Sequence, residues 1–490
     1  MTSTAGHTTG HATEGTRAVD RGLWAGYEAT DGAAFDVLDP ATGDVVARLR
    51  DDDEAAVDAA VARASAAAAE WAATPVRRRS EVLMGAFTRM RERREELAAL
   101  IGLENGKARA DALAEVDYAA EYFRWYAEEA VRLRGEHFTN PTGTNRVLVD
   151  HEPVGVCVLV TPWNFPAAMA TRKIGPALAA GCTAILKPAS ETPLTAIAVA
   201  TLLAEAGLPD GVLQLVVTTR ARQVVSRLME HEAVRLLSFT GSTEVGRVLL
   251  AQAAGSVMRT TMELGGNAPF LVLDDAVLDD AVAGAMVAKM RNGGQACTAA
   301  NRFYVQSGIH DAFVDELCAR MSAVSVGPAS DPATECGPLI NAAAVDKVAE
   351  LVEDAVAKGA RVRLGGARPE GPGTYYPPTV LVDVPPDARI LAEEVFGPVA
   401  PVVRFEDVDA AVAAANDTVH GLVSYLYTGD LARGLRLASR LRAGMVAVNR
   451  GLVSDPAAPF GGVKQSGVGR EGSHEGLLEY VDVKYVATTW

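Results

Sequence analysis

Residues 154–160 read Val-Gly-Val-Cys-Val-Leu-Val and lead directly into Thr161-Pro162-Trp163-Asn164-Phe165-Pro166. A short apolar run that ends at a stiff, proline-bounded turn is typical of a buried strand in a parallel sheet. Three similar runs follow, separated by helical segments of about ten to fifteen residues. This alternation predicts parallel α/β units that form a dinucleotide-binding domain. The three runs cover residues 183–186, 212–217 and 234–239.

A second set of apolar runs indicates a further α/β domain downstream. Upstream, residues 51–135 are rich in alanine, with charged residues at helical spacing, and predict a helical run. The second series comprises strands predicted at 270–273, 303–306 and 380–382, and helices predicted at 281–289 and 312–321.

Two segments alternate in apolar and polar character, residues 138–151 and the C-terminal stretch 479–489. Exposed strands of this kind tend to pair with another chain. We therefore expect a homo-oligomer, either a homodimer or a homotetramer.

Composition restricts the class of protein. At 490 residues, 49% of them hydrophobic, the chain is too long for a single core and predicts two or three domains. Its 46 Lys and Arg against 62 Asp and Glu give a net charge of −16, which disfavours nucleic acid and anionic membranes as partners. The five scattered cysteines show no metal-ligand spacing and favour a reducing cytoplasm with no metal site. Residues 1–20 lack an apolar core, so we expect a disordered tail and neither a signal peptide nor a membrane span.

The candidate nucleophile is Cys297, in the run Arg291-Asn292-Gly293-Gly294-Gln295-Ala296-Cys297-Thr298-Ala299. Two preceding glycines let the backbone bend closely around a substrate, and small residues follow. This context favours a presented thiol. From the local sequence alone, a buried free cysteine is an equally good interpretation.

Seven motifs, in this order and spacing, decide between the two interpretations, because together they resemble the aldehyde dehydrogenase superfamily from about residue 35 to the end. The resemblance implies an α/β, aldehyde dehydrogenase-like fold with a Rossmann-like cofactor domain, an α/β catalytic domain and a small bridging sheet that joins subunits. Besides the Cys297 segment, the motifs are 161–166, 186–190, 239–246, 262–267, 393–398 and 459–464. The implied domains are 21–135 with 152–262 for the cofactor, 263–469 for catalysis, and 136–151 with 470–490 for bridging.

The resemblance also implies the reaction, oxidation of an aldehyde to a carboxylate through a thioester at Cys297. A thiol suits this role because it is polarisable, easily ionised and a good leaving group. Asn164 and the backbone amide of Cys297 would stabilise the oxyanion, although Asn164 alone could be an ordinary turn residue. Glu263 would be the general base, its pKa raised by partial burial, although a glutamate at a strand end is usually structural. Lys173 and Glu471 match the family's proton-relay pair.

The cofactor site departs from the usual pattern, since no Gly-x-Gly-x-x-Gly motif occurs. Instead, residues 239–246 end a strand and open a helix, whose free amides favour a pyrophosphate or are simply capped by Ser242 or Thr243. Lys187 follows a strand at the carboxyl edge of the sheet, where nucleotides bind; a solvated lysine is the alternative. The resemblance assigns cofactor contacts to Thr161, Pro162, Trp163, Lys187, Ser190, Gly241, Ser242, Leu264, Glu394 and Phe396.

Three residues bear on the substrate. Arg172 lies eight residues after Asn164, and Arg291 lies six before Cys297. With Ser454, two guanidinium forks would clamp a carboxylate, whereas either arginine alone would be better interpreted as a surface ion-pair partner.

These positions resemble the succinate-semialdehyde dehydrogenase subfamily, as does the run 167–182, and Phe165 joins them as a pocket residue. We therefore expect a small aldehyde with a distal carboxylate as the substrate. Glutarate semialdehyde and an uncharged aldehyde are the alternatives, and a non-enzymatic scaffold is disfavoured because Cys297, Glu263 and Asn164 are all present. Ala299 stands where redox-regulated members carry a second cysteine, so disulfide switching is not expected.

Ser190 predicts a preference for NADP, with NAD also possible. NAD-specific relatives commonly carry a glutamate at this position, which would repel a 2′-phosphate. The neutral serine removes that repulsion and leaves Lys187 free to pair with the phosphate. Arg220 and Arg222 could add positive charge, although both are better interpreted as solvated residues at a helix start.

Overall fold

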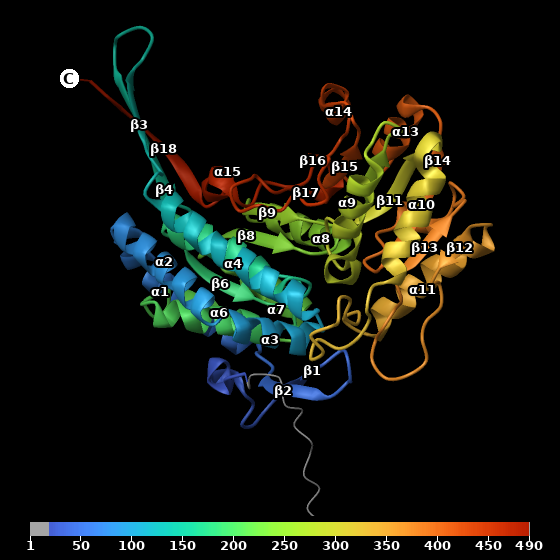
Figure 1. Cartoon of the computed structure of the whole chain (residues 1–490). Helices are drawn as coiled ribbons and strands as arrows, with labels where there is room; N and C mark the ends of the chain where they lie inside the picture. Colours follow the sequence, from blue (N-terminus) through green and yellow to red (C-terminus); the bar gives the residue numbers. More distant parts are fainter. Residues whose placement is uncertain (1–18, 490) are drawn as a thin grey trace, which may run out of the picture.

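The computed structural model describes residues 19–489, and two large sheets covered by helices dominate it (Figure 1). The first sheet has the strand order β17-β9-β8-β5-β6-β7 and is parallel except for β17. Its strands are β5 (Val156–Val160), β6 (Thr183–Lys187), β7 (Leu213–Leu215), β8 (Val234–Thr240), β9 (Arg259–Glu263) and β17 (Gly467–Val468).

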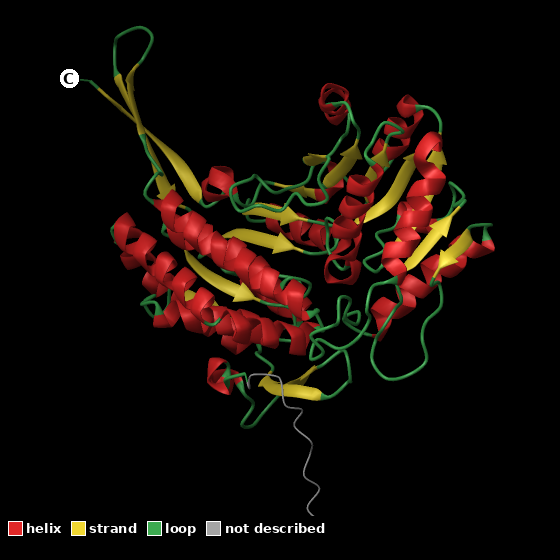
Figure 2. Cartoon of the chain, in the orientation of Figure 1, coloured by secondary structure: helices red, strands yellow, loops and turns green. Residues whose placement is uncertain are grey.

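Long helices cover both faces of this sheet (Figure 2). β5, β6 and β8 are buried almost throughout, because helices exclude water from both sides. The helices on its strands are α1 (Glu54–Ala73), α5 (Pro166–Ala180), α7 (Ala221–Glu230) and α8 (Thr243–Ala254), and those packed mainly on other helices are α2 (Val76–Glu92), α3 (Arg94–Asn105), α4 (Arg109–Ala130), α6 (Pro193–Glu205) and α15 (Ser473–Leu478).

The second sheet has the order β12-β13-β14-β11-β10-β15-β16 and is parallel except for β12. Its strands are β10 (Ala268–Val272), β11 (Ala300–Gln306), β12 (Arg361–Leu364), β13 (Thr379–Val382), β14 (Val399–Phe405), β15 (Val423–Tyr427) and β16 (Met445–Val448). Its helices are α9 (Leu278–Met290), α10 (Ser307–Ser322), α11 (Ala342–Ala357), α12 (Arg389–Ala392), α13 (Val408–Asn416) and α14 (Leu431–Ala438).

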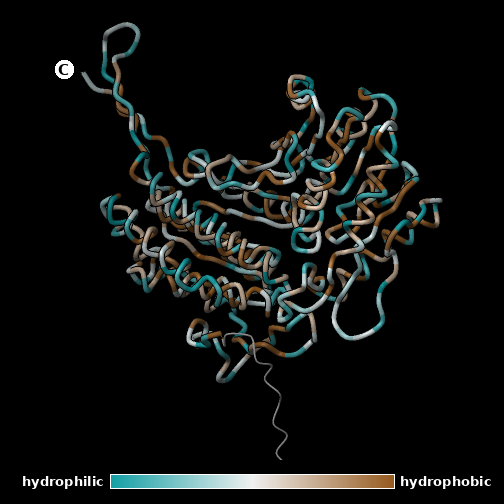
Figure 3. Tube along the Cα trace, in the orientation of Figure 1, coloured by the Kyte–Doolittle hydropathy of each residue, from teal (hydrophilic) through white to brown (hydrophobic). Residues whose placement is uncertain are grey.

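A three-stranded antiparallel sheet projects from the body at the upper left of Figure 1. It consists of β3 (Glu136–Thr139), β4 (Arg146–Pro153) and β18 (Val481–Thr488), and β18 pairs with β4 along its whole length. A separate ribbon is formed by β1 (Ala34–Leu38) and β2 (Val45–Arg50). In Figure 3 the strands of the two large sheets are mostly hydrophobic, in keeping with the buried cores around them.

The predicted α/β architecture is confirmed. Each apolar run named above contains a strand, although β5 starts only at Val156, because Gly155 takes a left-handed φ of 117° and turns the chain out of β4. The prediction of a tail at residues 1–20 lies almost entirely outside the described residues. The residue boundaries of the domains stay a prediction.

Candidate active site

The turn after β5 presents Asn164 at the carboxyl edge of the first sheet. Pro166 is the first residue of α5, and its fixed φ suits the start of a helix. Asn164 is buried, and its Nδ2 donates to the carbonyl of Gln295 at 3.2 Å. Its Oδ1 has no hydrogen-bond partner among the described residues. The second hydrogen of Nδ2 is left for a ligand.

The loop that carries Cys297 has an unusual backbone. Asn292, Gly293 and Gly294 take left-handed φ values of 53°, 60° and 78° in succession. A side chain at Gly294 would lie 2.2 Å from the carbonyl oxygen of Gly397, so only glycine fits there. This tight turn delivers Cys297 just before β11, with Ala299 buried behind it.

Burial raises the pKa of the Cys297 thiol to about 12, against the lowering effect of Arg172. The Cys297 side chain is half-buried, and its thiol must lose its proton before or during attack.

Glu263 is the last residue of β9 and is buried. Burial, and then repulsion by Glu471, raises its pKa well above the usual range. Neither carboxyl oxygen has a hydrogen-bond partner among the described residues. A buried carboxyl with high proton affinity and unused oxygens is what a general base requires.

Cys297, Glu263 and Asn164 all line one cavity of about 280 Å³ between the two large sheets. The rings of Trp163 and Phe396 meet edge-on across it, with centroids 5.4 Å apart. Predicted cofactor residues that also line it are Pro162, Trp163, Gly241, Ser242, Leu264, Glu394 and Phe396. Thr161, Lys187 and Ser190 lie outside this lining.

On the cofactor side, Ser242 caps α8 by accepting from Val245 N at 3.3 Å. Burial raises the pKa of Glu394 to about 7, and its Oε1 accepts from Gly266 N at 3.3 Å. Lys187 is buried at the end of β6 and makes no hydrogen bond through Nζ within residues 19–489. A buried ammonium that lacks a hydrogen-bond acceptor fits a polar or anionic ligand such as a nucleotide.

Around Lys187 the charges are mixed. Ser190 donates its hydroxyl to Glu191 Oε2 at 3.1 Å. Arg220 and Arg222 are both exposed, but the Arg220 guanidinium donates to the carbonyls of Asp51 and Asp52 at 3.1 Å each. The structure therefore leaves Arg222, and not Arg220, as the more available cation at this edge.

The predicted relay pair is present as a buried ion pair. Lys173 Nζ lies 2.6 Å from Glu471 Oε1 and 2.8 Å from Ser238 Oγ. Arg172 also pairs with Glu471 through its Nε, and its guanidinium lies 4.4 Å from the centre of the Phe460 ring. Burial acts to raise the pKa of Glu471, but the two cations more than offset it and hold the pKa below its usual range.

The three predicted substrate residues differ in the contacts that they make within the chain. Arg172 already holds a carboxylate of its own chain. Arg291 is half-buried, donates to Thr298 Oγ1 at 3.3 Å and lies over the Phe165 ring at 4.9 Å. Ser454 is half-exposed in the loop after β16, and no described hydrogen bond joins it to either arginine.

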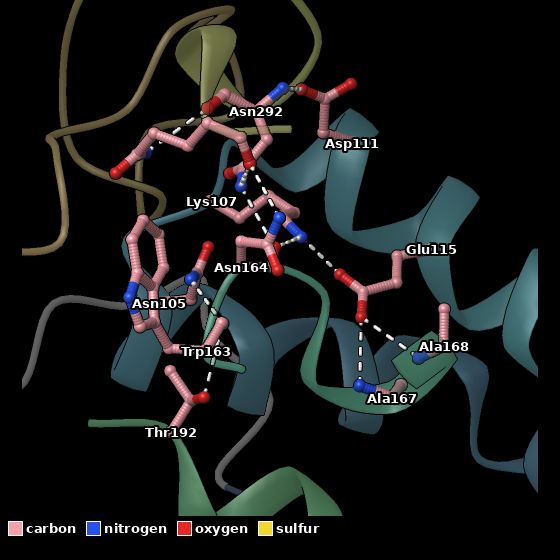
Figure 4. A network of polar contacts seen from close by, with 11 residues as sticks. Asn105, Lys107, Asp111, Glu115, Trp163, Asn164, Ala167, Ala168, Thr192 and Asn292 are labelled. Carbon is pink, nitrogen blue, oxygen red and sulfur yellow. Dashed lines mark hydrogen bonds and ion pairs between the residues drawn. The ribbon is translucent and has the colours of Figure 1, made fainter. Parts of the chain in front are cut away.

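A buried polar network behind the site was not predicted (Figure 4). Lys107 donates to the Asn164 carbonyl at 2.8 Å and pairs with Glu115, whose Oε1 accepts from Ala167 N at 2.9 Å. Asn105 and Thr192 both donate to the Trp163 carbonyl. No local pattern marks these side chains, because they come from segments predicted only as helical run or strand connection.

Sequence reasoning also missed part of the cavity lining. Met169 could have been placed there, since it follows Asn164 on the helix that opens from the turn. Ala344 and Lys347 come from α11, remote in sequence from every motif. The missed residues are Met169, Thr240, Gly265, Ala344, Lys347 and Val395.

Within residues 19–489, no group of three His, Cys, Asp or Glu side chains is arranged to hold a metal ion. No helix in the same range is both long and apolar enough to cross a membrane.

The model of the aldehyde dehydrogenase family matches residues 27–486. A succinate-semialdehyde dehydrogenase of Paenarthrobacter nicotinovorans is 52% identical over 87% of this chain and 95% of its own length. A glutarate-semialdehyde dehydrogenase of Pseudomonas aeruginosa is 47% identical over 95% of this chain and 96% of its own. A crystal structure described as an Escherichia coli NADP-dependent enzyme superposes with a TM-score of 0.93 at 46% identity, covering 94% of this chain and 96% of that one.

Proposed function

Because the chain belongs to the aldehyde dehydrogenase family, we propose that it oxidises succinate semialdehyde to succinate, with NADP as the preferred oxidant. One observation supports the reaction type above all: a thiol, a partnerless buried carboxyl and an amide donor line the same cavity. Together they supply a nucleophile, a base and an oxyanion donor, the minimum set for acyl transfer through a thioester.

In the proposed reaction, the Cys297 sulfur attacks the aldehyde carbon, and Asn164 Nδ2 with the Cys297 backbone amide holds the resulting oxyanion. Ser242, Glu394 and Phe396 would hold the nicotinamide cofactor, which would supply the acceptor for the hydride that leaves that carbon. Glu263 then takes a proton from the water that cleaves the thioester, so aldehyde, water and oxidised cofactor yield carboxylic acid, reduced cofactor and a proton. Glu471 and Lys173 would carry that proton away from the cavity.

For the distal carboxylate of the substrate we favour Arg291 as the principal partner. Its contacts are one hydroxyl and one ring face, whereas Arg172 is neutralised in part by Glu471. Arg172 would contribute long-range positive charge, and Ser454 a hydroxyl. A four-carbon chain is the first choice, and the P. aeruginosa relative supports glutarate semialdehyde as the second.

The test is reduced-cofactor formation over succinate semialdehyde, glutarate semialdehyde and butanal, each with NADP and with NAD. We expect succinate semialdehyde with NADP to give the highest kcat/KM, and Cys297→Ala to abolish turnover while retaining cofactor binding. An equal kcat/KM for butanal would overturn the carboxylate clamp. Turnover by Cys297→Ala near the wild-type rate would overturn the covalent route.

Assembly and location are proposed on separate grounds. The projecting sheet exposes apolar side chains along β18, which supports a homodimer or homotetramer. All five cysteines are free thiols, which supports a reducing compartment such as the cytoplasm.

A further inference from the structure

The side-chain amide of Asn292 joins two loops that belong to different sheets. Its Nδ2 donates to the carbonyl of Asn164 at 2.9 Å and to the carbonyl of Gln295 at 3.2 Å (Figure 4). Asn164 lies in the turn after β5, and Gln295 lies two residues before Cys297. Both hydrogens of this one NH₂ group therefore link the turn that carries Asn164 to the loop that carries Cys297.

The bridge is built into a strained and buried position. Asn292 is 4% exposed and has a φ of 53°, a left-handed conformation that asparagine tolerates better than most residues. Its backbone N–H donates to Asp111 Oδ2 at 2.6 Å, which fixes the residue on α4. The side chain therefore has little freedom to leave the two carbonyls.

The far side of the bridge is held independently. Lys107 Nζ donates to the same Asn164 carbonyl, and Glu115 accepts from the first amides of α5. The turn that carries Asn164 is thus fixed to α4 and α5 whether or not Asn292 is present. Asn292 adds a hydrogen-bonded link that fixes the distance between that turn and the Cys297 loop.

We propose that Asn292 is a positioning residue that sets Asn164 Nδ2 and the Cys297 backbone amide at the spacing that the oxyanion requires. The inference rests on the function proposed above. Without the bridge, the turn and the loop would keep only the direct hydrogen bond from Asn164 Nδ2 to the Gln295 carbonyl, and their spacing would be less fixed. Displacements of about 1 Å in such constellations cost up to roughly a hundredfold in rate.

The experiment compares Asn292→Gly and Asn292→Asp with wild type. Glycine keeps the left-handed backbone and removes the amide, whereas aspartate keeps the shape and replaces both donors by an acceptor that repels the two carbonyls. Asn449→Gly is the matched control, since Asn449 also has a left-handed φ, of 54°, and bridges backbone groups, those of Thr428, away from the cavity.

Three readouts separate positioning from general damage: the single-turnover rate of NADPH formation, the affinity for NADP, and the rate of Cys297 alkylation by iodoacetamide. Alkylation needs the thiol but builds no oxyanion. We expect both Asn292 variants to lose roughly tenfold to a hundredfold in the single-turnover rate, with alkylation and NADP affinity within about twofold of wild type and Asn449→Gly unchanged in all three.

A wild-type rate in both Asn292 variants would overturn the inference. So would a parallel loss of alkylation, which would mean that the whole Cys297 loop is disturbed, or an equal loss in Asn449→Gly. Failure of the proposed function would look different, because wild-type protein would then give no NADPH with any aldehyde.

Discussion

Glu191, the residue after Ser190, also bears on cofactor choice. Its carboxylate accepts from the Ser190 hydroxyl and acts on Lys187, whose pKa is lowered by burial and raised in part by Glu191 and Asp51. We propose that Glu191 supplies, one position later, the repulsive carboxylate expected of NAD-specific proteins. A 2′-phosphate bound at Lys187 would share the cation with it.

Glu191→Gln should therefore raise the ratio of kcat/KM for NADP over NAD. Removing the charge of a half-buried carboxylate near a phosphate should change this ratio by roughly two- to fivefold. Steady-state kinetics with both cofactors at low salt measures it, and Glu232→Gln, an exposed glutamate before β8, is the control. An unchanged or lower ratio would show that Glu191 points away from the ribose.

Asn164, Glu263 and Cys297 could be selected through motifs that resemble the aldehyde dehydrogenase family, and the structure brings all three to one cavity. Lys107, Glu115 and Asn292 could not, because their roles depend on hydrogen bonds to segments far away along the chain. Arg172 is an intermediate case. Its place near the site follows from its position on the helix after the Asn164 turn. Its ion pair with Glu471 joins residues too far apart in sequence for a local pattern to indicate it.

At the level of elements, α5 and α6 share a construction. Both begin with proline and have no side-chain cap of their own. A buried glutamate from a neighbouring helix accepts their first amides instead, Glu115 for α5 and Glu104 for α6. A carboxyl group at a helix N-terminus accepts from free backbone donors, and when ionised it also complements the helix dipole.

Glu104 should make stability depend on pH. Burial raises its pKa to about 8, above the unfolded value near 4.5. The folded state therefore favours the protonated form, and the contribution of Glu104 to stability is full below about pH 4.5 and is lost as pH rises toward 8.

Glu104→Gln, which mimics the protonated form, should gain stability relative to wild type between pH 5 and pH 8 in urea unfolding. Glu70→Gln, on the exposed face of α1, should show no such trend. A stability difference between Glu104→Gln and wild type that stays constant over this range would contradict the buried, proton-dependent role of Glu104.

Strand prediction succeeded for β5, β6 and β8, which are mostly apolar runs and are buried. Burial alone did not ensure success, because β15 is buried throughout and was not predicted. β9 reads Arg-Thr-Thr-Met-Glu and has no such run, because its outer end is only half-buried and its last residue is the candidate base. β1 and β2 are likewise partly exposed, so no apolar run marks them.

At the scale of the whole molecule, the projecting sheet is the surface that we propose for contact between subunits. Val483 and Tyr485 on β18 are 66% and 58% exposed, and Phe138 on β3 is 46% exposed. Apolar side chains gathered on a small sheet that stands away from the body are typical of an interface between copies.

The double variant Val483→Lys with Tyr485→Glu should shift the protein from an oligomer to a monomer, because it buries charges in the contact. Sedimentation velocity measures the mass, and Val257→Lys, at the 91% exposed turn after α8, is the control. A wild-type monomer, or a variant that keeps the wild-type mass, would contradict this role for β18.

The chain returns to its first sheet only at its end. β17 pairs with β9, and Glu471 reaches Lys173, 298 residues earlier. During synthesis, the nucleophile and the base leave the ribosome long before this last segment does. A growing chain therefore carries Cys297 before Glu471 has been synthesised. The ion pairs around the site form only when translation is nearly over.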